Sequence, residues 1–326
     1  MIKAVIAGGT GYTAGELLRI LINHPKVEVV AVLSSSLAGE SVSSVHRDLY
    51  GDTALRFVST PDIDADVLFL TLGHGLSVGY LERLNLPEKC KIIDLGNDFR
   101  IKPFYKGREF VYGFSEANRE EIRKAQYVAN PGCFATAILV SLTPLRADGL
   151  LSNEIHLHAI TGSTGAGKSP TESTHFSYRD SNISVYKPFA HQHLGEIKRF
   201  LGELSKCSEV PKINFVPLRG DFTRGILTSL YTKTPTTHSL AEIYTLFESY
   251  YKNSSFVKIS HVPLSMKEVV NTNKALIHIE EHNGYLHITS VIDNLLKGAS
   301  GQAVQNMNLM FGVEESCGLK LKASAF

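Results

Sequence analysis

A cysteine and two histidines have the residue types and surroundings that nucleophilic chemistry requires. Cys133 follows a Pro-Gly turn and begins the apolar stretch FATAILVSL, which predicts a helix. A helix N-terminus stabilises a thiolate through its dipole and its free backbone N–H groups. His191 and His193 lie in KPFAHQHLGEIKRF, just before a second helical pattern. An imidazole near the thiol can accept its proton and later donate one, so these residues predict covalent catalysis.

Two non-catalytic interpretations of the same residues remain open. Cysteines are most often buried core residues, which is the position we expect for Cys90, Cys207 and Cys317. A histidine pair at i, i+2 can also bind a metal, but no third ligand of suitable spacing lies nearby, and we expect no metal. Cys133 differs from the other cysteines because a nucleotide-binding loop and the histidine pair accompany it.

The N-terminus carries a glycine-rich loop between a strand and a helix. The strand IKAVIA is followed by GGTGYTAG at residues 8–15 and then by a helical pattern. Such a loop lets backbone N–H groups approach a pyrophosphate at the positive end of the helix dipole, although a purely structural turn is the alternative. The expected cofactor contacts are Gly8, Thr10, Gly11, Tyr12, Thr13 and Gly15.

The next strand, VEVVAVL, ends in Ser34, Ser35 and Ser36. Sites that prefer NAD usually have Asp or Glu at this position, which binds the ribose hydroxyls. Serine hydroxyls tolerate a 2′-phosphate and can bind it, so we predict NADP(H) as the cofactor. A serine-rich turn without nucleotide contact is the alternative.

Residues 162–169, GSTGAGKS, match the phosphate-loop pattern of nucleotide triphosphatases. A functional phosphate loop runs into an amphipathic helix. Here Ser169 is followed directly by Pro170, and no helical spacing of apolar residues comes after it. The pattern is therefore not expected to mark a triphosphatase.

The elements that must position these residues form two regions with different patterns of secondary structure. The first third of the 326-residue chain alternates strands and helices, which predicts an α/β Rossmann domain with a parallel, doubly wound sheet. Later strands such as GILTSLYTK and KALIHIEEH alternate in polarity, which predicts a second domain of a different kind. We expect the first domain over 1–145, the second over 146–297, and a C-terminal helical segment, 298–326, packed on the first domain.

Composition excludes several classes of partner. The 33 Lys and Arg residues are balanced by 32 Asp and Glu, so we expect neither nucleic acid nor a membrane surface as a partner. No stretch approaches the roughly 20 apolar residues of a membrane helix, and the N-terminus does not read as a signal peptide. With four scattered cysteines and no CxxC spacing, a reducing, cytoplasmic location is expected.

Four segments together resemble the N-acetyl-γ-glutamyl-phosphate reductase family: GGTGYTAGEL, NPGCFAT, HQHLGEI and SVIDNLLKGASGQAVQNMNLMFG. The resemblance covers essentially the whole chain. It implies a fold related to aspartate-semialdehyde dehydrogenase and glyceraldehyde-phosphate dehydrogenase, in a homodimer or homotetramer. In that fold the first domain is an NADP-binding Rossmann domain, and the second is an α+β catalytic and dimerisation domain. It also implies reductive dephosphorylation of N-acetylglutamyl 5-phosphate to the semialdehyde in arginine biosynthesis. The same chemistry on N-succinylglutamyl phosphate or a carrier-linked aminoadipyl phosphate is the alternative, and a non-catalytic NADP-binding protein is a remote one.

The resemblance also implies roles for individual residues. Cys133 corresponds to the nucleophile, and His193 corresponds to the acid/base, with His191 as second choice. This chain has Gly195 where the family commonly has proline, which leaves the choice between the two histidines open.

Further candidate contacts with the substrate and the cofactor follow from the same resemblance. Arg100 in GNDFR and Arg224 in FTRGIL are candidate contacts for the substrate phosphate. A turn similar to GSTGAG lies beside the cofactor in related dehydrogenases. Ser163, Gly165 and Ala166 are therefore expected cofactor contacts.

Overall fold

The computed structural model describes residues 1–59, 64–204 and 209–324. The chain divides into two compact units. The first comprises Met1–Pro131 and Ala299–Lys320, and the second comprises Gly132–Gly298 and Leu321–Phe326. Cys207, for which we expected a buried position, lies outside the described residues.

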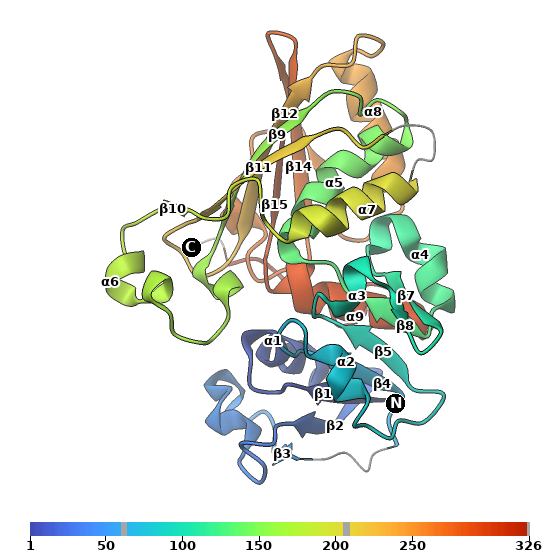
Figure 1. Cartoon of the computed structure of the whole chain (residues 1–326), viewed down its shortest axis with the longest axis vertical. Coiled ribbons are helices and arrows are strands. Elements are labelled where there is room, and N and C mark those ends of the chain that lie inside the picture. The colour runs from blue at the N-terminus through green and yellow to red at the C-terminus, as the bar shows by residue number, and fades with distance from the viewer. Residues whose placement is uncertain (60–63, 205–208, 325–326) are drawn as a thin grey trace. The chain divides into compact units, whose positions relative to one another are not determined.

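The first unit is an α/β domain with an eight-stranded sheet in the order β3-β2-β1-β4-β5-β8-β7-β6 (Figure 1). Neighbouring strands are parallel except for the antiparallel pair β6 and β7. Its strands are β1 (Ile2–Ala7), β2 (Val27–Leu33), β3 (Phe57–Val58), β4 (Val67–Leu70), β5 (Lys91–Asp94), β6 (Phe104–Tyr105), β7 (Arg108–Tyr112) and β8 (Tyr127–Ala129). Its helices are α1 (Tyr12–Leu21), α2 (Ser77–Leu81), α3 (Asp98–Ile101), α4 (Ser115–Lys124) and α9 (Gly301–Met310). The predicted parallel, doubly wound sheet is confirmed.

Burial explains why the sequence forms this sheet. All four residues of β4 are buried, as a strand covered on both faces requires. The helix α9 packs against α1, α4 and β5 of the same unit, and each of its residues is buried. The helix ends at Met310, well before residue 326, because Gly312 follows it in the left-handed conformation (φ 65°) that closes many helices.

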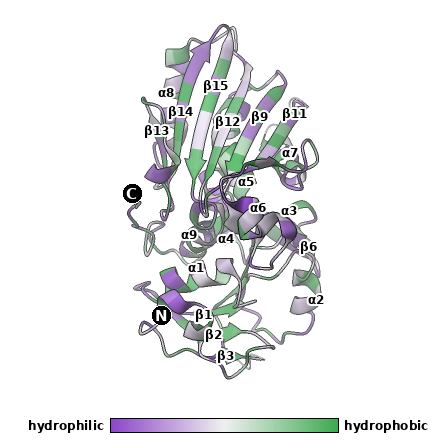
Figure 2. Cartoon of the chain, turned by 90° about the vertical axis from the view of Figure 1, so that its left-hand side faces the viewer, coloured by the Kyte–Doolittle hydropathy of each residue, from purple (hydrophilic) through white to green (hydrophobic). Residues whose placement is uncertain are grey.

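The second unit contains a seven-stranded mixed sheet in the order β10-β11-β9-β12-β15-β14-β13. Its strands are β9 (Ile155–Thr161), β10 (Ser184–Val185), β11 (Ile213–Arg219), β12 (Ile226–Lys233), β13 (Val257–Ser260), β14 (Ala275–His282) and β15 (Tyr285–Ile292). Its helices are α5 (Cys133–Ala147), α6 (Phe176–Arg179), α7 (His193–Leu204) and α8 (Leu240–Tyr251). In β12, buried and more exposed residues alternate, as expected for a sheet with one covered face. Figure 2 shows hydrophobic residues concentrated on the strands of this sheet.

Helices cover that face. α5 packs against β12, β14, β15 and α7, and α8 packs against β13 and β14 (Figure 1). The segment SLAEIYTLFESYYKN, in which apolar and aromatic residues recur at helical spacing, forms α8, which begins with a capping box between Ser239 and Glu242. Among the described residues, no helix has the length and apolar character needed to span a membrane.

The division of the chain differs from the predicted boundary after residue 145. α5 belongs to the second unit, because it packs against the sheet and α7 there. Every residue from Phe134 to Arg146 is buried. A helix that is apolar on all sides does not indicate in the sequence which neighbours will cover it.

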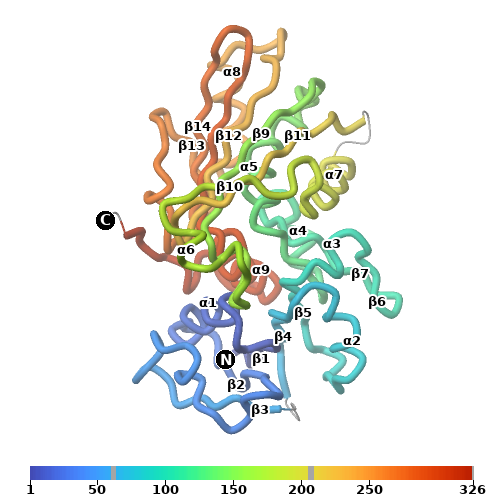
Figure 3. Tube along the Cα trace, turned by 60° about the vertical axis from the view of Figure 1, so that its left-hand side comes forward, coloured from blue at the N-terminus to red at the C-terminus, as the bar shows by residue number. Residues whose placement is uncertain are grey.

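Between β9 and β10 the chain leaves the sheet in an excursion that carries α6 (Figure 3). It begins with the residues of the phosphate-loop pattern. They form a single short turn, η3 (Ser163–Ala166), and the next helical turn, η4 (Glu172–Thr174), is just as short. The long helix of a phosphate loop is therefore absent from this described segment.

Candidate active site

Cys133 is the first residue of α5 and is half-buried. The N-cap residue is Gly132, which supplies no side-chain cap to the first turn of the helix. A fifteen-residue helix carries a substantial dipole, and its positive end lies at the thiol. This arrangement stabilises the negative charge that a nucleophilic sulfur needs.

Gly298 closes one side of Cys133. It lies in the π-helical turn η6 (Leu296–Ser300). A Cβ atom built on Gly298 would lie 2.8 Å from the Cβ of Cys133, which is closer than real contacts allow. Only glycine fits this position without moving the nucleophile.

Glu196 connects the two helix starts that carry the predicted catalytic residues. Its Oε2 accepts a hydrogen bond from the backbone N–H of Gly132, at 3.1 Å. Its Oε1 lies 3.8 Å from Nε2 of His193, one turn earlier on α7. The carboxylate is 2% exposed. A buried carboxylate between the Cys133 turn and His193 positions both.

The two histidines have different environments. The Nδ1 atom of His191 accepts a hydrogen bond from the backbone N–H of His193, at 3.2 Å. Burial lowers the pKa of His191 to about 4, and the positive charge of Lys187 contributes. His191 is therefore neutral near pH 7, whereas His193 has a carboxylate beside it. The geometry favours His193 as the acid/base.

Aromatic rings surround the histidines. The Phe134 ring lies 5.3 Å from the His191 ring and 6.1 Å from the His193 ring. Phe215 of β11 packs against Phe134 at 5.3 Å, and Tyr186 lies 5.7 Å from His191. Such a wall excludes water, which strengthens the electrostatic interactions of the site.

Arg224 forms a bidentate ion pair with buried Asp293. Its Nε atom lies 3.1 Å from Oδ2 and its Nη2 atom lies 3.3 Å from Oδ1. Asp293 also accepts the backbone N–H of Leu295, and its carbonyl accepts that of Gly298. The predicted phosphate contact is thus already engaged, and the pair holds the turn that places Gly298 against Cys133.

Arg100, the other predicted phosphate contact, belongs to the first unit and is buried. Its Nε atom donates to the carbonyl of Asn130 and its Nη2 atom donates to that of Leu95, each at 2.9 Å. These bonds fix the backbone after β5 and after β8. Like Arg224, Arg100 is used by the protein itself.

The N-terminal glycine loop has the geometry of a pyrophosphate cradle. Gly8 has φ 80°, which favours glycine, and a Cβ on Gly9 would lie 2.3 Å from a methyl group of Val32. A Cβ on Gly11 would meet nothing within 4 Å, so the loop faces open space there. Gly11 is also the N-cap of α1 and provides no side-chain cap, so the first N–H groups of α1 can bind phosphate. The residues present fit a dinucleotide.

The other predicted cofactor residues of the first unit lie in the glycine loop, at the start of α1 or directly after β2. Gly15 packs against His46, since a Cβ there would lie 2.6 Å from its Nδ1. The carbonyl of Thr13 accepts a hydrogen bond from Ser300. Cofactor contacts remain predictions for the residues that flank α1 and β2: Thr10 precedes α1, Tyr12 begins it, and Ser34, Ser35 and Ser36 directly follow β2.

Ser163, Gly165 and Ala166 belong to η3 of the second unit. The turn is held by Thr164, whose hydroxyl donates to the carbonyl of Thr223 and accepts from Asn294 Nδ2. Gly165 and Ala166 are exposed. A cofactor contact of this turn stays a prediction.

Several side chains of the site were not predicted from the sequence. Glu196 had a usable signal, because it lies three residues after His193, where two helical residues share a face. Gly298 had none, because its contact with Cys133 spans a long stretch of sequence.

The remaining cysteines differ from Cys133. Cys90 is buried, and burial raises the pKa of its thiol to about 12, which makes it unreactive. Cys317 is half-buried rather than buried as predicted, since it lies in the turn after α9. Among residues 1–59, 64–204 and 209–324, no three His, Cys, Asp or Glu side chains converge as metal ligands would.

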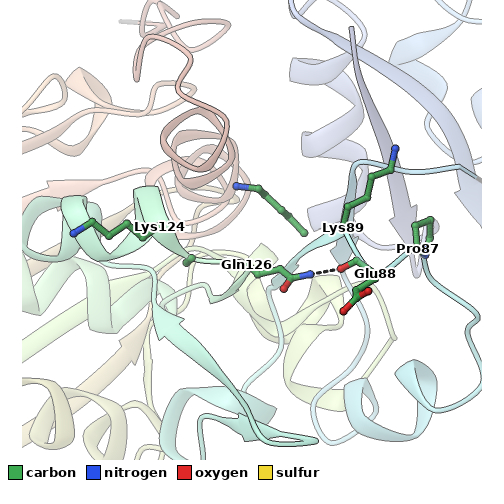
Figure 4. A pocket seen from close by; sticks show the side chains of 7 residues that line it. Pro87, Glu88, Lys89, Lys124 and Gln126 are labelled. Atoms are coloured by element: carbon green, nitrogen blue, oxygen red, sulfur yellow. Dashed lines mark hydrogen bonds between the residues drawn. The ribbon is translucent and has the colours of Figure 1, made fainter.

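A pocket of about 610 Å³ lies in the first unit, at the amino ends of β5 and β8. Lys89 and Lys124 line it but point away from one another, while Gln126 bonds to Glu88 (Figure 4). Lys91 donates to the carbonyl of Met310 at 2.5 Å. Ligands of open α/β sheets bind at the carboxyl ends of the strands, so this pocket is not the cofactor site.

Family models match both units. The model described as semialdehyde dehydrogenase, NAD binding domain, matches residues 3–125, and the model described as semialdehyde dehydrogenase, dimerisation domain, matches residues 133–294. Among solved structures, aspartate semialdehyde dehydrogenase II from Vibrio cholerae complexed with ASA has a TM-score of 0.73 at 17% identity. That alignment covers 96% of this chain and 98% of the other. The fold and both family models thus define a two-domain semialdehyde dehydrogenase.

Relatives of high sequence identity narrow this class of proteins to one family. N-acetyl-gamma-glutamyl-phosphate reductase from Bacteroides thetaiotaomicron is 52% identical, and that from Christiangramia forsetii is 51% identical; both alignments cover 100% of each chain. This chain belongs to the N-acetyl-gamma-glutamyl-phosphate reductase family.

Proposed function

We propose that this chain catalyses the NADPH-dependent reductive dephosphorylation of N-acetyl-L-glutamyl 5-phosphate to N-acetyl-L-glutamate 5-semialdehyde and phosphate. The observation that carries the proposal is the link through Glu196 between the Cys133 turn and His193. The names of the relatives identify the substrate class.

The residues suggest how the reaction begins. The Cys133 sulfur attacks the acyl carbonyl, a C–S bond forms, and the C–O bond to phosphate breaks, which leaves a thioester. The positive end of the α5 dipole stabilises the oxyanion, and a preorganised contact of this kind is often worth roughly 3–4 kcal/mol in the barrier. A bound NADPH supplies the hydride that reduces the thioester.

His193 completes the proton transfers. It accepts the thiol proton when Cys133 ionises and, as an imidazolium beside Glu196, supports the oxyanion of the thiohemiacetal. When the C–S bond breaks and the aldehyde leaves, the proton returns to the sulfur. The aromatic wall around His191 keeps water from hydrolysing the thioester.

The test is phosphate-dependent reduction of NADP with N-acetyl-L-glutamate semialdehyde. The N-succinyl semialdehyde should be assayed in parallel, because the same chemistry would act on it. Cys133→Ser should lower the rate by at least about 10³-fold while NADPH binding is retained. Cys317→Ser is the matched control, since it removes the other half-buried thiol. Turnover by Cys133→Ser near the wild-type rate would overturn the mechanism.

We also propose that the chain forms a homodimer through the second unit. The family model for this unit is a dimerisation domain. The helices α5 and α8 cover one face of its sheet, and the opposite face carries exposed residues such as Tyr231 and His158. Light scattering at several concentrations distinguishes a dimer from a tetramer, and Tyr231→Glu should weaken the assembly.

A further inference from the structure

Two arginines of the second unit have no carboxylate partner among the described residues. Arg179 ends α6 and is 6% exposed; its Nη1 donates to Ser184 at 3.3 Å and its Nη2 donates to the carbonyl of Asn182 at 3.0 Å. Arg219 ends β11, and its Nη1 donates weakly to Ser173, at 3.4 Å. In both residues the Nε atom is buried without an acceptor. Arg179 is buried and Arg219 is half-buried, and a guanidinium whose Nε atom is buried normally has a counter-ion or another acceptor.

The two guanidinium groups lie on the same face of the sheet edge. Ser184 of β10 pairs directly with Arg219 of β11, so their side chains share a face. Arg179 reaches the hydroxyl of that same Ser184. The carboxylate next along the chain, Asp221, accepts the backbone N–H of Ser181 at 2.7 Å instead. An anion between the two arginines would offset their mutual repulsion.

Tyr186 connects this pair to the catalytic residues. Its ring lies 4.8 Å from Cζ of Arg219 and 5.7 Å from the ring of His191. Burial raises the pKa of Tyr186, a negative charge on Cys133 raises it further, and Arg219 lowers it. The phenol therefore lies within electrostatic reach of both the nucleophile and the guanidinium of Arg219.

The spacing along β11 indicates which anionic group of the substrate would reach Arg219. Phe215 contacts Phe134, the residue after Cys133, whereas Arg219 lies four residues farther along the strand, about 13 Å at the usual rise. The phosphate leaves from the carbon that bonds to the Cys133 sulfur. The carboxylate of a glutamyl chain lies several bonds away from that carbon, at the distal end.

We propose that Arg179 and Arg219 form a carboxylate subsite that holds the distal end of the N-acylglutamyl substrate. The subsite rests on the proposed function, and Tyr186 forms the wall between it and the histidines. Two carboxylates are possible sources. The α-carboxylate is present in every N-acylglutamyl substrate, and the terminal carboxylate of the acyl group is present only in an N-succinyl substrate.

The experiment compares KM values in the phosphate-dependent direction for Arg219→Met, Arg179→Met and the wild type. The aldehydes are N-acetyl-L-glutamate semialdehyde, its N-succinyl counterpart, and 4-acetamidobutanal, which has no carboxylate. Loss of a charged hydrogen bond should raise KM for the carboxylate-bearing aldehydes by at least tenfold, on the order of 100-fold if bidentate. KM for 4-acetamidobutanal and for inorganic phosphate should not change. An effect confined to the N-succinyl aldehyde assigns the acyl carboxylate, and an effect on both assigns the α-carboxylate.

Two matched variants distinguish the loss of carboxylate binding from general damage to the protein. Arg199→Met removes a guanidinium that already pairs with Glu203, so it should leave every KM unchanged. Arg219→Lys keeps the charge without the planar fork and should recover part of the loss. A rise in KM for phosphate, or an equal rise for all three aldehydes, would overturn the subsite. If the wild type turns over none of these aldehydes, the proposed function fails instead; protection of Cys133 from iodoacetamide by N-acetyl-L-glutamate, lost in Arg219→Met, then tests the subsite alone.

Discussion

The carboxylate of Glu196 lies 3.8 Å from Nε2 of His193 while it accepts the N–H of Gly132, the residue before the nucleophile. One buried side chain thus contacts both His193 and the turn before Cys133, the two residues that we propose as catalytic groups. Preorganisation of this kind lowers a reaction barrier.

Glu196→Gln separates the two functions of this carboxylate. Glutamine keeps an oxygen that can accept from Gly132 but brings no negative charge to His193. We expect kcat to fall roughly tenfold while Tm and KM for phosphate change little. Steady-state kinetics and thermal unfolding give these values, and a kcat within twofold of the wild type would show that the charge is not used.

Replacing each histidine by glutamine identifies the acid/base. Because the pKa of His191 is lowered to about 4, this residue does not change its charge between pH 6 and pH 9. His191→Gln should keep the shape of the pH profile of kcat. In His193→Gln the part of the pH profile that depends on the acid/base should disappear, and kcat should fall by about 10²–10⁴-fold. The opposite pattern would assign the proton transfers to His191.

Gly298→Ala tests the closure of the site beside Cys133. The added methyl group would lie 2.8 Å from the Cβ of Cys133, so the start of α5 must shift. We expect a loss of activity on the order of 10²-fold. Gly79→Ala is the matched control, because nothing lies within 4 Å of a Cβ at that helical position. Equal activity of the two variants would contradict the tight contact.

Ser34→Asp tests the choice of cofactor. Ser34 directly follows β2, where a carboxylate would repel a 2′-phosphate and accept the ribose hydroxyls of NAD. The ratio of kcat/KM for NADP to that for NAD should fall by at least about tenfold. An unchanged ratio would place the 2′-phosphate elsewhere, and Ser44→Asp, an exposed serine in the 3₁₀ turn η1 (Val42–Ser44), controls for added charge.

Asp94 makes stability depend on pH. Burial raises the pKa of Asp94 to about 6, and its Oδ2 atom is buried without a partner. The folded state therefore binds this proton more tightly than the unfolded chain, and stability from this group is lost as pH rises through about 6. Asp94→Asn removes a cost of roughly 3 kcal/mol at pH 7.5 but little near pH 4. Unfolding by urea at both pH values checks this, and an equal change at both would refute it.

The sequence predicted the parts of the fold that depend on local patterns. The buried strand VLFL and the loop GGTGYTAG carry their parallel-sheet and phosphate-binding signals within a few residues. The position of α5 was not predictable, because a helix buried on all sides has no polar stripe that indicates its neighbours.

The residues of the site also divide into those with a local signal in the sequence and those without one. Cys133 and the histidines were found because a thiol at a helix start and an HxH pair are local features. Arg224 was predicted as a phosphate contact by its residue type, and that role stays a prediction. Its ion pair with Asp293 was not predictable, because the two residues lie far apart in the sequence. Arg219 lacks a carboxylate partner among the described residues. This too could not be predicted from the sequence, because it requires the positions of all nearby carboxylates in the structure.

The contact between Gly298 and Cys133 also bears on protein synthesis. Translation adds Cys133 long before Gly298, so their contact can form only after most of the second unit has been synthesised. Until then the thiol is not held in its folded position, and oxidation of an exposed thiol beyond the sulfenic acid is irreversible for most proteins. Slow elongation between these two codons would lengthen the exposure, and a reducing environment around the ribosome would shorten its consequences.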